Sequence, residues 1–265
     1  MTPPKTALTI AGSDSSGGAG IQADLKTFAA FGVYGTSAIT AVTAQNTVGI
    51  MEIVPLSADL VTAQIEAVAG DIVLHATKTG MLATAAIVEA VAAAIKELDL
   101  PLVVVDPVMV SKSGARLLDD DGIQMLRAEL VPRCAVVTPN IPEAEVLSGR
   151  RIGSIEDARA AAYEIHQIGG SAVIITGGHS EGAEIVDLLF DGKVFTELQT
   201  VRIDTPHTHG TGCTFASAIA ANLAAGHSLV DAFVRAQGYV AGAIEHALAI
   251  GRGHGPLDHF WKINI

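Results

Sequence analysis

Short runs of β-branched residues alternate with longer alanine-rich stretches, and this alternation restricts the fold more than any other feature of the sequence. Several short runs are apolar on both faces, which is typical of parallel strands covered by helices on both sides. Strands are predicted at residues 7–10, 37–43, 73–78, 102–105, 135–138 and 172–176. Helices are predicted at residues 21–30, 58–69, 83–98, 121–130, 154–167, 211–225 and 229–248.

A hairpin is predicted after the last of these strands. Residues 185–190 and 193–197 flank an Asp191-Gly192 pair, which is typical of a tight antiparallel turn. No repeat or linker divides the chain, so we predict a single domain over residues 1–265. It belongs to the α/β class, with a largely parallel central sheet, helices on both faces and an antiparallel edge hairpin.

The charge balance argues against two classes of partner. The chain has 28 acidic and 16 basic residues, a net charge of -12. Nucleic acids and anionic membranes both require clustered Lys and Arg, so neither is an expected partner. An anionic substrate remains compatible, because backbone dipoles can bind it locally.

The sequence also indicates a soluble cytoplasmic protein. Its two cysteines, Cys134 and Cys213, lie far apart and do not suggest a disulfide framework. The N-terminal apolar stretch is too short for a signal peptide. Residues 81–95 form the longest apolar-rich run, but Thr84 and Glu89 interrupt it, which favours a core helix over a membrane span.

A glycine-rich turn follows the first predicted strand, within residues 11–28. Its exposed amides suit close approach of a ligand, although a purely structural turn is also possible. Residues 18–23 formally match the dinucleotide fingerprint G-x-G-x-x-A. However, the first glycine lies several residues beyond the strand, and no acidic residue ends the next strand. A phosphate-binding P-loop is excluded because no Gly-Lys-Ser/Thr follows.

The segment Gly210-Thr211-Gly212-Cys213 opens a predicted alanine-rich helix. Successive amides at a helix N-terminus form an anion site, so these residues are candidates for binding phosphate. Cys213 would lie in the first turn, where the helix dipole favours a thiolate. The alternative is that Cys213 is a small buried apolar residue.

Polar residues follow two further strands. Asp106 comes after the strand at 102–105, and Asn140 and Glu143 come after the strand at 135–138. The carboxyl ends of parallel strands form the crevice where open α/β sheets bind ligands. These three residues could hold a hydrated magnesium ion, although each alone is more often a turn or cap residue.

Seven blocks of sequence, in order from the first strand to the last residues, resemble the hydroxymethylpyrimidine/phosphomethylpyrimidine kinase family of the ribokinase superfamily. The blocks are AGSDSSGGAGIQADLKTF (11–28), TAVTAQNT (40–47), KTGML (78–82), DPVMVSKSG (106–114), TPNIPEAE (138–145), HGTGCTFASAIAA (209–221) and GRGHGP (251–256). The resemblance implies a ribokinase-like fold and MgATP-dependent phosphorylation of 4-amino-5-hydroxymethyl-2-methylpyrimidine. Its monophosphate would then be converted to the diphosphate, in thiamine biosynthesis. Relatives are commonly homodimers.

The resemblance also implies roles for individual residues. Cys213 stands where most ribokinase relatives carry a catalytic Asp, so it becomes the candidate general base or the group that orients the attacking hydroxyl. The implied pyrimidine-binding residues are Gln45 and Asp24, with Gly12, Met81 and Val108 lining the pocket. The helix start described above predicts an anion hole at Gly210, Thr211 and Gly212. The predicted nucleotide-binding residues are Asp106, Asn140, Glu143 and Thr176, with Asp106 and Glu143 as metal ligands.

The chain departs from the family at Thr176, where many members carry a Lys that would add positive charge near the triphosphate. Lys112 could compensate, although a solvated surface Lys is the simpler interpretation. Pyridoxine/pyridoxal kinase, a relative with a similar hydroxymethyl substrate, is the nearest alternative function; Gln45 favours the pyrimidine. A nicotinamide-dependent dehydrogenase lacks its ribose-binding acid. A ligand-sensing module without activity would leave Cys213 and Asp106 without a shared role.

Overall fold

Six neighbouring strands run parallel in one sheet, and antiparallel strands flank them at both edges. The computed structural model describes residues 3–111, 114–179 and 184–262. The strand order is β3-β2-β1-β4-β5-β6-β7-β8-β9, in which β3, β8 and β9 are the antiparallel members. The bounds are β1 Thr6–Asp14, β2 Tyr34–Gln45, β3 Ile50–Pro55, β4 Ala76–Thr79, β5 Val103–Val105, β6 Val136–Val137, β7 Ala172–Ile175, β8 Glu184–Phe190 and β9 Phe195–Val201.

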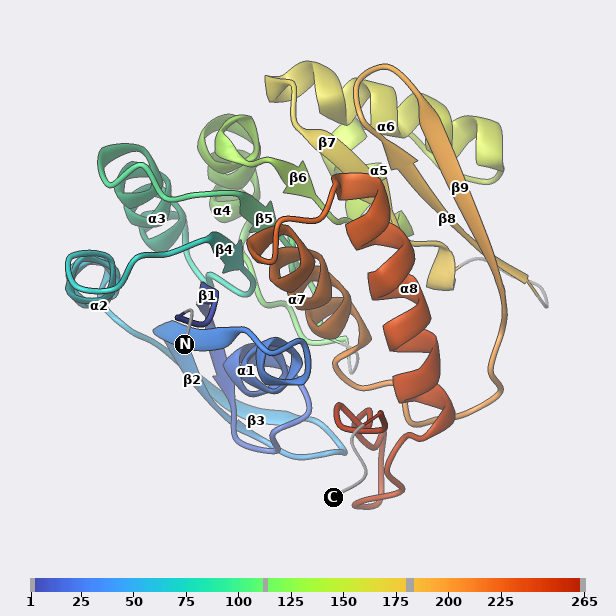
Figure 1. Ribbon diagram of the computed structural model, residues 1–265, viewed down its shortest axis with the longest axis horizontal. Coiled ribbons are helices and arrows are strands. Elements are labelled where there is room, and N and C mark those ends of the chain that lie inside the picture. Colours follow the sequence, from blue (N-terminus) through green and yellow to red (C-terminus); the bar gives the residue numbers. More distant parts are fainter. Residues whose placement is uncertain (1–2, 112–113, 180–183, 263–265) are drawn as a thin grey trace.

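Helices cover both faces of this sheet (Figure 1). The bounds on one face are α2 Ala58–Ala69, α3 Ala85–Glu97, α4 Asp120–Met125, α5 Ile141–Ser148 and α6 Ile155–Gly169, and on the other α1 Gly20–Ala30, α7 Thr211–Ala224 and α8 Leu229–Glu245. Short helices of other types are η1 Leu126–Leu130, η2 Val131–Arg133 and η3 Gly177–His179. In the described residues no helix is long and apolar enough to cross a membrane.

The central strands are apolar on both faces because each face meets its own core. In β5, Val103 and Val105 pack into the cluster beneath α2 to α6, whereas Val104 packs into the cluster beneath α1, α7 and α8. Strand β7 divides its residues between the two clusters in the same way. The prediction of a largely parallel sheet with helices on both faces is therefore confirmed.

The edges of the sheet were predicted less completely. The hairpin β8–β9 is confirmed, with Asp191 accepting from the amides of Lys193 and Val194 in the turn. A second antiparallel edge, β2–β3, was missed because β3 is short and largely exposed. Helix α5 was also missed. The predicted α-helix at 121–130 is wrong in its second half, since residues 126–130 form a π-helix.

The parallel strands direct their carboxyl ends to one edge of the sheet. Asp14 ends β1 and Gln45 ends β2, while Asp106, Thr138 and Thr176 directly follow β5, β6 and β7. Open α/β sheets bind their ligands at this edge.

Candidate active site

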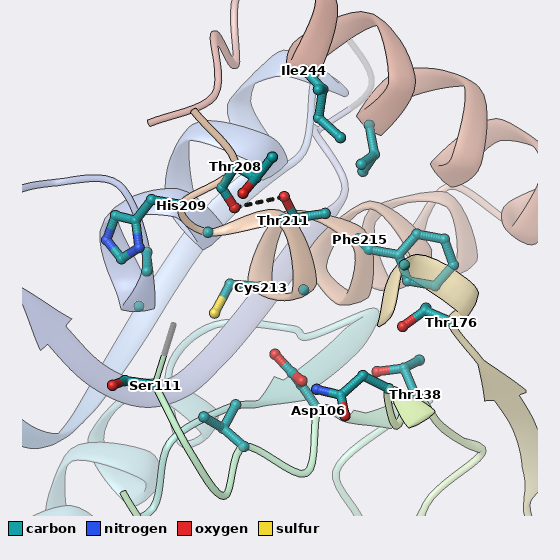
Figure 2. Close-up of a pocket in the computed structure, with 18 of the residues that line it drawn as sticks. Asp106, Ser111, Thr138, Thr176, Thr208, His209, Thr211, Cys213, Phe215 and Ile244 are labelled. Atoms are coloured by element: carbon teal, nitrogen blue, oxygen red, sulfur yellow. Dashed lines mark hydrogen bonds between the residues drawn. The ribbon is translucent and has the colours of Figure 1, made fainter. Parts of the chain in front are cut away.

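One pocket of about 550 Å³ lies at the carboxyl edge of the sheet and brings together nearly all of the predicted site residues. Those that line it are Gly12, Gln45, Met81, Asp106, Val108, Asn140, Glu143, Thr176, Gly210, Thr211, Gly212 and Cys213. Figure 2 shows Cys213 at the start of α7, between His209 on one side and Phe215 and Thr176 on the other. Lys112, suggested as a compensating cation, lies outside the described residues.

Asp24, which the resemblance implies as a pyrimidine contact, has its carboxylate beneath the pocket lining. Asp24 is fully buried on α1 and does not line the cavity. Its Oδ1 accepts from Ser217 Oγ at 2.6 Å, and its Oδ2 accepts from Thr9 Oγ1 at 2.6 Å. Lys78 Nζ donates to both oxygens, at 3.0 and 2.9 Å. The carboxylate is thus occupied by the protein itself.

Lys78, which was not predicted as a site residue, is the buried cation of this region. Its ammonium lies 2.9 Å from Asp24 Oδ2 and 3.8 Å from Asp106 Oδ2. Burial alone would lower the pKa of Lys78, but the nearby acidic groups, Asp24 above all, outweigh it and the pKa is raised. Lys78 therefore stays protonated. A single Lys within the buried run of β4 was the only sequence signal for it.

Asp106 and Glu143 form an acidic pair in the pocket. Burial raises the pKa of Asp106 to about 6; the Lys78 charge opposes this shift and the Asp24 charge adds to it. Burial and then the Asp106 charge raise the pKa of Glu143 to about 8. Asp106 Oδ2 is buried and has no hydrogen-bond partner among the described residues. Two buried carboxyl groups with raised pKa values, one of them with an oxygen that accepts no hydrogen bond in the described residues, fit a divalent cation.

Asn140 and Glu143 also build the start of α5. Asn140 Oδ1 accepts from the Glu143 amide at 3.0 Å, and Glu143 Oε2 accepts from the Asn140 amide at 3.0 Å. This reciprocal capping box fixes the Glu143 side chain toward the pocket. Asn140 therefore positions Glu143 as well as lining the cavity.

The loop predicted to bind an anion directly precedes and opens α7. Gly210 caps α7 with a φ of +84°, and a Cβ on it would lie 1.8 Å from the carbonyl oxygen of Gly18. Only glycine fits this position. The Thr211 hydroxyl donates to the Thr208 carbonyl at 2.8 Å and fixes the first turn (Figure 2). The first amides of a helix have no acceptor within it, which suits an anion; here the Thr211 amide donates to the Thr208 carbonyl at 3.4 Å, outside the helix.

The predicted thiolate at Cys213 is wrong. Its side chain faces Asp106 (Figure 2). Burial raises the pKa of the Cys213 thiol to about 12; the Lys78 charge opposes this shift, whereas the charges of Asp106 and Asp24 add to it. Desolvation and two nearby carboxylates thus outweigh the Lys78 charge. Cys213 is a protonated thiol at neutral pH.

Two groups of lining residues were not predicted. At the end of β1 and before α7, Asp14 and His209 join Gln45 on one side of the pocket. On the side of α8, apolar Phe215, Val240 and Ile244 line it. Asp14 follows the first strand and His209 precedes the glycine motif, so both positions carried a signal. The apolar residues are spaced as ordinary core residues of helices.

Comparison with known proteins gives a consistent assignment. Residues 14–258 match the model of a family described as phosphomethylpyrimidine kinase. A hydroxymethylpyrimidine/phosphomethylpyrimidine kinase of Bacillus subtilis is 52% identical over 255 residues, covering 96% of this chain and 94% of the relative. A thiamine biosynthesis bifunctional protein of Geobacter sulfurreducens is 49% identical over 257 residues, covering 97% of this chain and 52% of that protein.

A solved structure is similar along its whole length. The ADP complex of Bacillus subtilis pyridoxal kinase superposes with a TM-score of 0.92 at 41% identity, covering 99% of this chain and all of the other. The fold is therefore ribokinase-like. Together with the family match and the identities above, this shows that the chain belongs to the phosphomethylpyrimidine kinase family.

Proposed function

We propose that the protein transfers the γ-phosphoryl group of MgATP to the hydroxymethyl group of 4-amino-5-hydroxymethyl-2-methylpyrimidine and then phosphorylates the monophosphate to the diphosphate. The observation that carries this proposal is a single pocket that contains an amide for a heteroaromatic edge, a helix N-terminus for phosphate, and an acidic pair for a cation. Phosphoryl transfer requires positioning and charge neutralisation more than covalent chemistry.

The pyrimidine occupies the end of the pocket that contains Gln45. Gly12, Met81 and Val108 line the same cavity and supply apolar contacts to a planar ring. A Cβ on Gly12 would lie 3.1 Å from the Met81 sulfur, so the glycine leaves room for both the ring and Met81. The Gln45 amide can accept from the 4-amino group and donate to a ring nitrogen.

Cys213 orients the attacking hydroxyl. A thiol whose pKa is about 12 is a poor base at neutral pH, so the general-base role is not the one we propose. Phosphoryl transfer is loose, and the attacking hydroxyl loses its proton late. The amides of Gly210, Thr211 and Gly212 stabilise the charge of the group in transfer.

Asp106 and Glu143 would hold Mg²⁺. The cation would supply charge neutralisation for the triphosphate. The described residues that line the pocket include five carboxylates, from Asp14, Asp106, Glu143, Asp187 and Asp204, but only one Arg or Lys side chain, that of Arg202. A triphosphate therefore needs an added cation. Since no cluster of three metal-binding side chains occurs in the described part of the chain, phosphates and water complete the shell.

The nucleotide occupies the side of the pocket formed by Asn140, Thr176 and the apolar residues of α7 and α8. Thr176 donates its amide to the Pro139 carbonyl at 3.0 Å, and the two strand ends are thereby joined. A neutral residue at 176 makes the metal more important for the triphosphate than it would be beside a Lys.

We also propose that the protein is a cytoplasmic homodimer. The β2–β3 edge exposes Tyr34 (58%), Met51 (71%) and Val54 (50%), and a second copy is the simplest cover for them. Sedimentation at micromolar concentration tests this: a monomer would contradict it.

Pyridoxine kinase activity is the second candidate, favoured by the 41% identity to a pyridoxal kinase of the same fold. An ATP-consumption assay with the pyrimidine and with pyridoxine side by side tests both candidates. We expect a higher kcat/KM for the pyrimidine, followed by a second phosphorylation of its product. A preference for pyridoxine would overturn the assignment.

A further inference from the structure

Three side chains meet at the pyrimidine end of the pocket. His209 Nε2 lies 2.8 Å from Asp14 Oδ2, and the Gln45 amide nitrogen lies 3.3 Å from the same imidazole nitrogen. Asp14 and His209 are only 3% and 9% exposed, and both line the pocket. The mechanism above uses Gln45 but gives no role to Asp14 or His209.

The hydrogen bonds and protonation state of Asp14 determine which nitrogen of His209 carries a hydrogen. Asp14 Oδ1 accepts from the Ser16 amide and hydroxyl, both at 2.8 Å, and Oδ2 accepts from the amides of Gly18 at 3.1 Å and Ala19 at 2.8 Å. Burial would raise the pKa of Asp14, but the hydrogen bonds of His209 and Ser16 outweigh it and lower the pKa to about 2. Asp14 is a carboxylate and only accepts. His209 Nε2 must therefore carry a hydrogen and donate it.

With this hydrogen on His209, one of the two orientations of the Gln45 amide places a donor against a donor and an acceptor against an acceptor. Its Nε2 would present a donor to the donor His209 Nε2. Its Oε1 lies 3.3 Å from Thr43 Oγ1, whose single hydrogen is already donated to the Ser13 carbonyl at 3.0 Å. Exchanging the nitrogen and oxygen of the amide removes both conflicts, because each then faces a group of the opposite kind. The exchange is allowed because the two groups have nearly the same shape.

In the exchanged orientation every group has a partner of the right kind. Gln45 Oε1 accepts from His209 Nε2, which it shares with Asp14, and Gln45 Nε2 donates to Thr43 Oγ1. We propose that His209 is a positioning residue that fixes this orientation of the Gln45 amide and so determines which heteroaromatic edge the pocket accepts. This inference rests on the proposed function, since it concerns the substrate of the same site.

The imidazole is held firmly enough to act in this way. The His209 amide donates to the Gly255 carbonyl at 3.2 Å, and the ring lies against the loop between β1 and α1. A Cβ on Gly18 would lie 2.4 Å from His209 Cδ2, so the ring fills the space that a side chain at 18 would need. His209 thus joins the glycine loop, the end of β2 and the anion-binding loop.

Fixing the amide gives the pocket an ordered pair of hydrogen-bonding groups. The remaining lone pair of Oε1 accepts from a 4-amino group, and the remaining N–H of Nε2 donates to the adjacent ring nitrogen. A 4-oxo analogue, 5-hydroxymethyl-2-methylpyrimidin-4-one, presents an acceptor and a donor in the opposite order. A fixed amide rejects this analogue, whereas an amide free to turn over accepts both edges.

The experiment compares kcat/KM for the 4-amino substrate and the 4-oxo analogue in three variants. His209→Phe keeps a planar ring but removes the donor. His209→Gln restores an N–H near the position of Nε2. His227→Phe removes an imidazole that is not part of the pocket lining and serves as the control. Calorimetric titration with an ATP analogue shows whether each variant retains its nucleotide site.

We expect the wild type and His227→Phe to prefer the 4-amino compound by about a hundredfold, the cost of unpaired buried polar groups. In His209→Phe the ratio should fall to about threefold or less, with unchanged nucleotide affinity, and in His209→Gln it should recover to about that of the wild type. Should His209→Phe fail to fold, Thr43→Val removes the other partner of the amide and should also reduce the ratio.

Two outcomes separate the inference from the proposed function. If the wild type is selective and neither His209→Phe nor Thr43→Val changes the ratio, the positioning role is overturned while the kinase assignment stands. If the wild type phosphorylates neither compound, the proposed function itself fails.

Discussion

At the scale of residues, the protonation state of the Cys213 thiol decides whether it can act as a base or only orient the attacking hydroxyl. The position of Cys213 in the first turn of α7 was predictable from the glycines that precede it. Its protonation state was not predictable, because it depends on the charges of Asp24, on α1, and Asp106, directly after β5. Both carboxylates are far from Cys213 in the sequence. The helix N-terminus alone therefore predicted a lowered pKa for the Cys213 thiol, whereas its pKa is raised.

Alkylation kinetics test the protonated thiol. With Cys134→Ala as the background, we expect iodoacetamide to modify Cys213 slowly at pH 7, since only the thiolate reacts. The rate should rise about tenfold per pH unit between pH 7 and 10, as it must when the pKa lies near 12. Cys213→Ala in the same background is the matched control. A rate that levels off below pH 9 would restore Cys213 as a candidate base.

At the scale of elements, the buried ion pair of Lys78 and Asp24 joins the two halves of the site. Thr9 on β1, Lys78 on β4, and Ser217 on α7 all donate to Asp24 on α1. The strands and helices themselves were predictable because apolar periodicity is local. The ion pair was not, since it depends on which strands become neighbours, and the sheet order places β4 beside β1.

Lys78→Met should destabilise the fold because it leaves the Asp24 charge buried without a partner. We expect a loss of about 3–5 kcal/mol in the free energy of unfolding, measured by urea denaturation. Asp24→Asn together with Lys78→Met should recover part of this loss. Thr77→Val is the control on the same strand: Thr77 Oγ1 is buried without a hydrogen-bond partner in the described residues, and its removal should change stability by less than about 1 kcal/mol. Equal stability of Lys78→Met and the wild type would contradict the role of the pair.

At the scale of the whole molecule, the proposed function requires an acidic protein to bind an acidic nucleotide. The net charge is -12, and the pocket lining has the same sign. Local dipoles and a divalent cation must therefore overcome the overall repulsion. The strand-end carboxylates that would hold the cation were predictable from their place after buried strands, because all parallel strands end at one edge.

Removing divalent metal should stop turnover and leave the fold intact. In excess chelator we expect no detectable phosphorylation of the pyrimidine, with an unchanged circular dichroism spectrum, and full recovery when Mg²⁺ is added back. Full activity in excess chelator would exclude the metal role of Asp106 and Glu143.

The metal-free protein should lose stability as the pH rises from about 4 to 8. Asp106 and Glu143 have folded-state pKa values of about 6 and 8, above their ordinary values of 3.8 and 4.5. A raised carboxyl pKa means that the folded state keeps a proton that the unfolded state releases. The stabilisation is therefore present below the unfolded pKa and is lost as the pH passes through the folded pKa.

Thermal unfolding measures this dependence. The Tm of the chelated wild type should fall between pH 5 and pH 8. Mg²⁺ should raise the Tm most at pH 8, because the two carboxyl groups are most ionised there. Glu143→Gln removes the group with the higher pKa and should flatten the fall between pH 6 and pH 8. Glu89→Gln, at an exposed position on α3, should leave the fall unchanged. If the Tm of the chelated wild type rises over this range, the pKa values of the two carboxyl groups are not raised in the folded state. Their pKa values would then no longer support a bound cation.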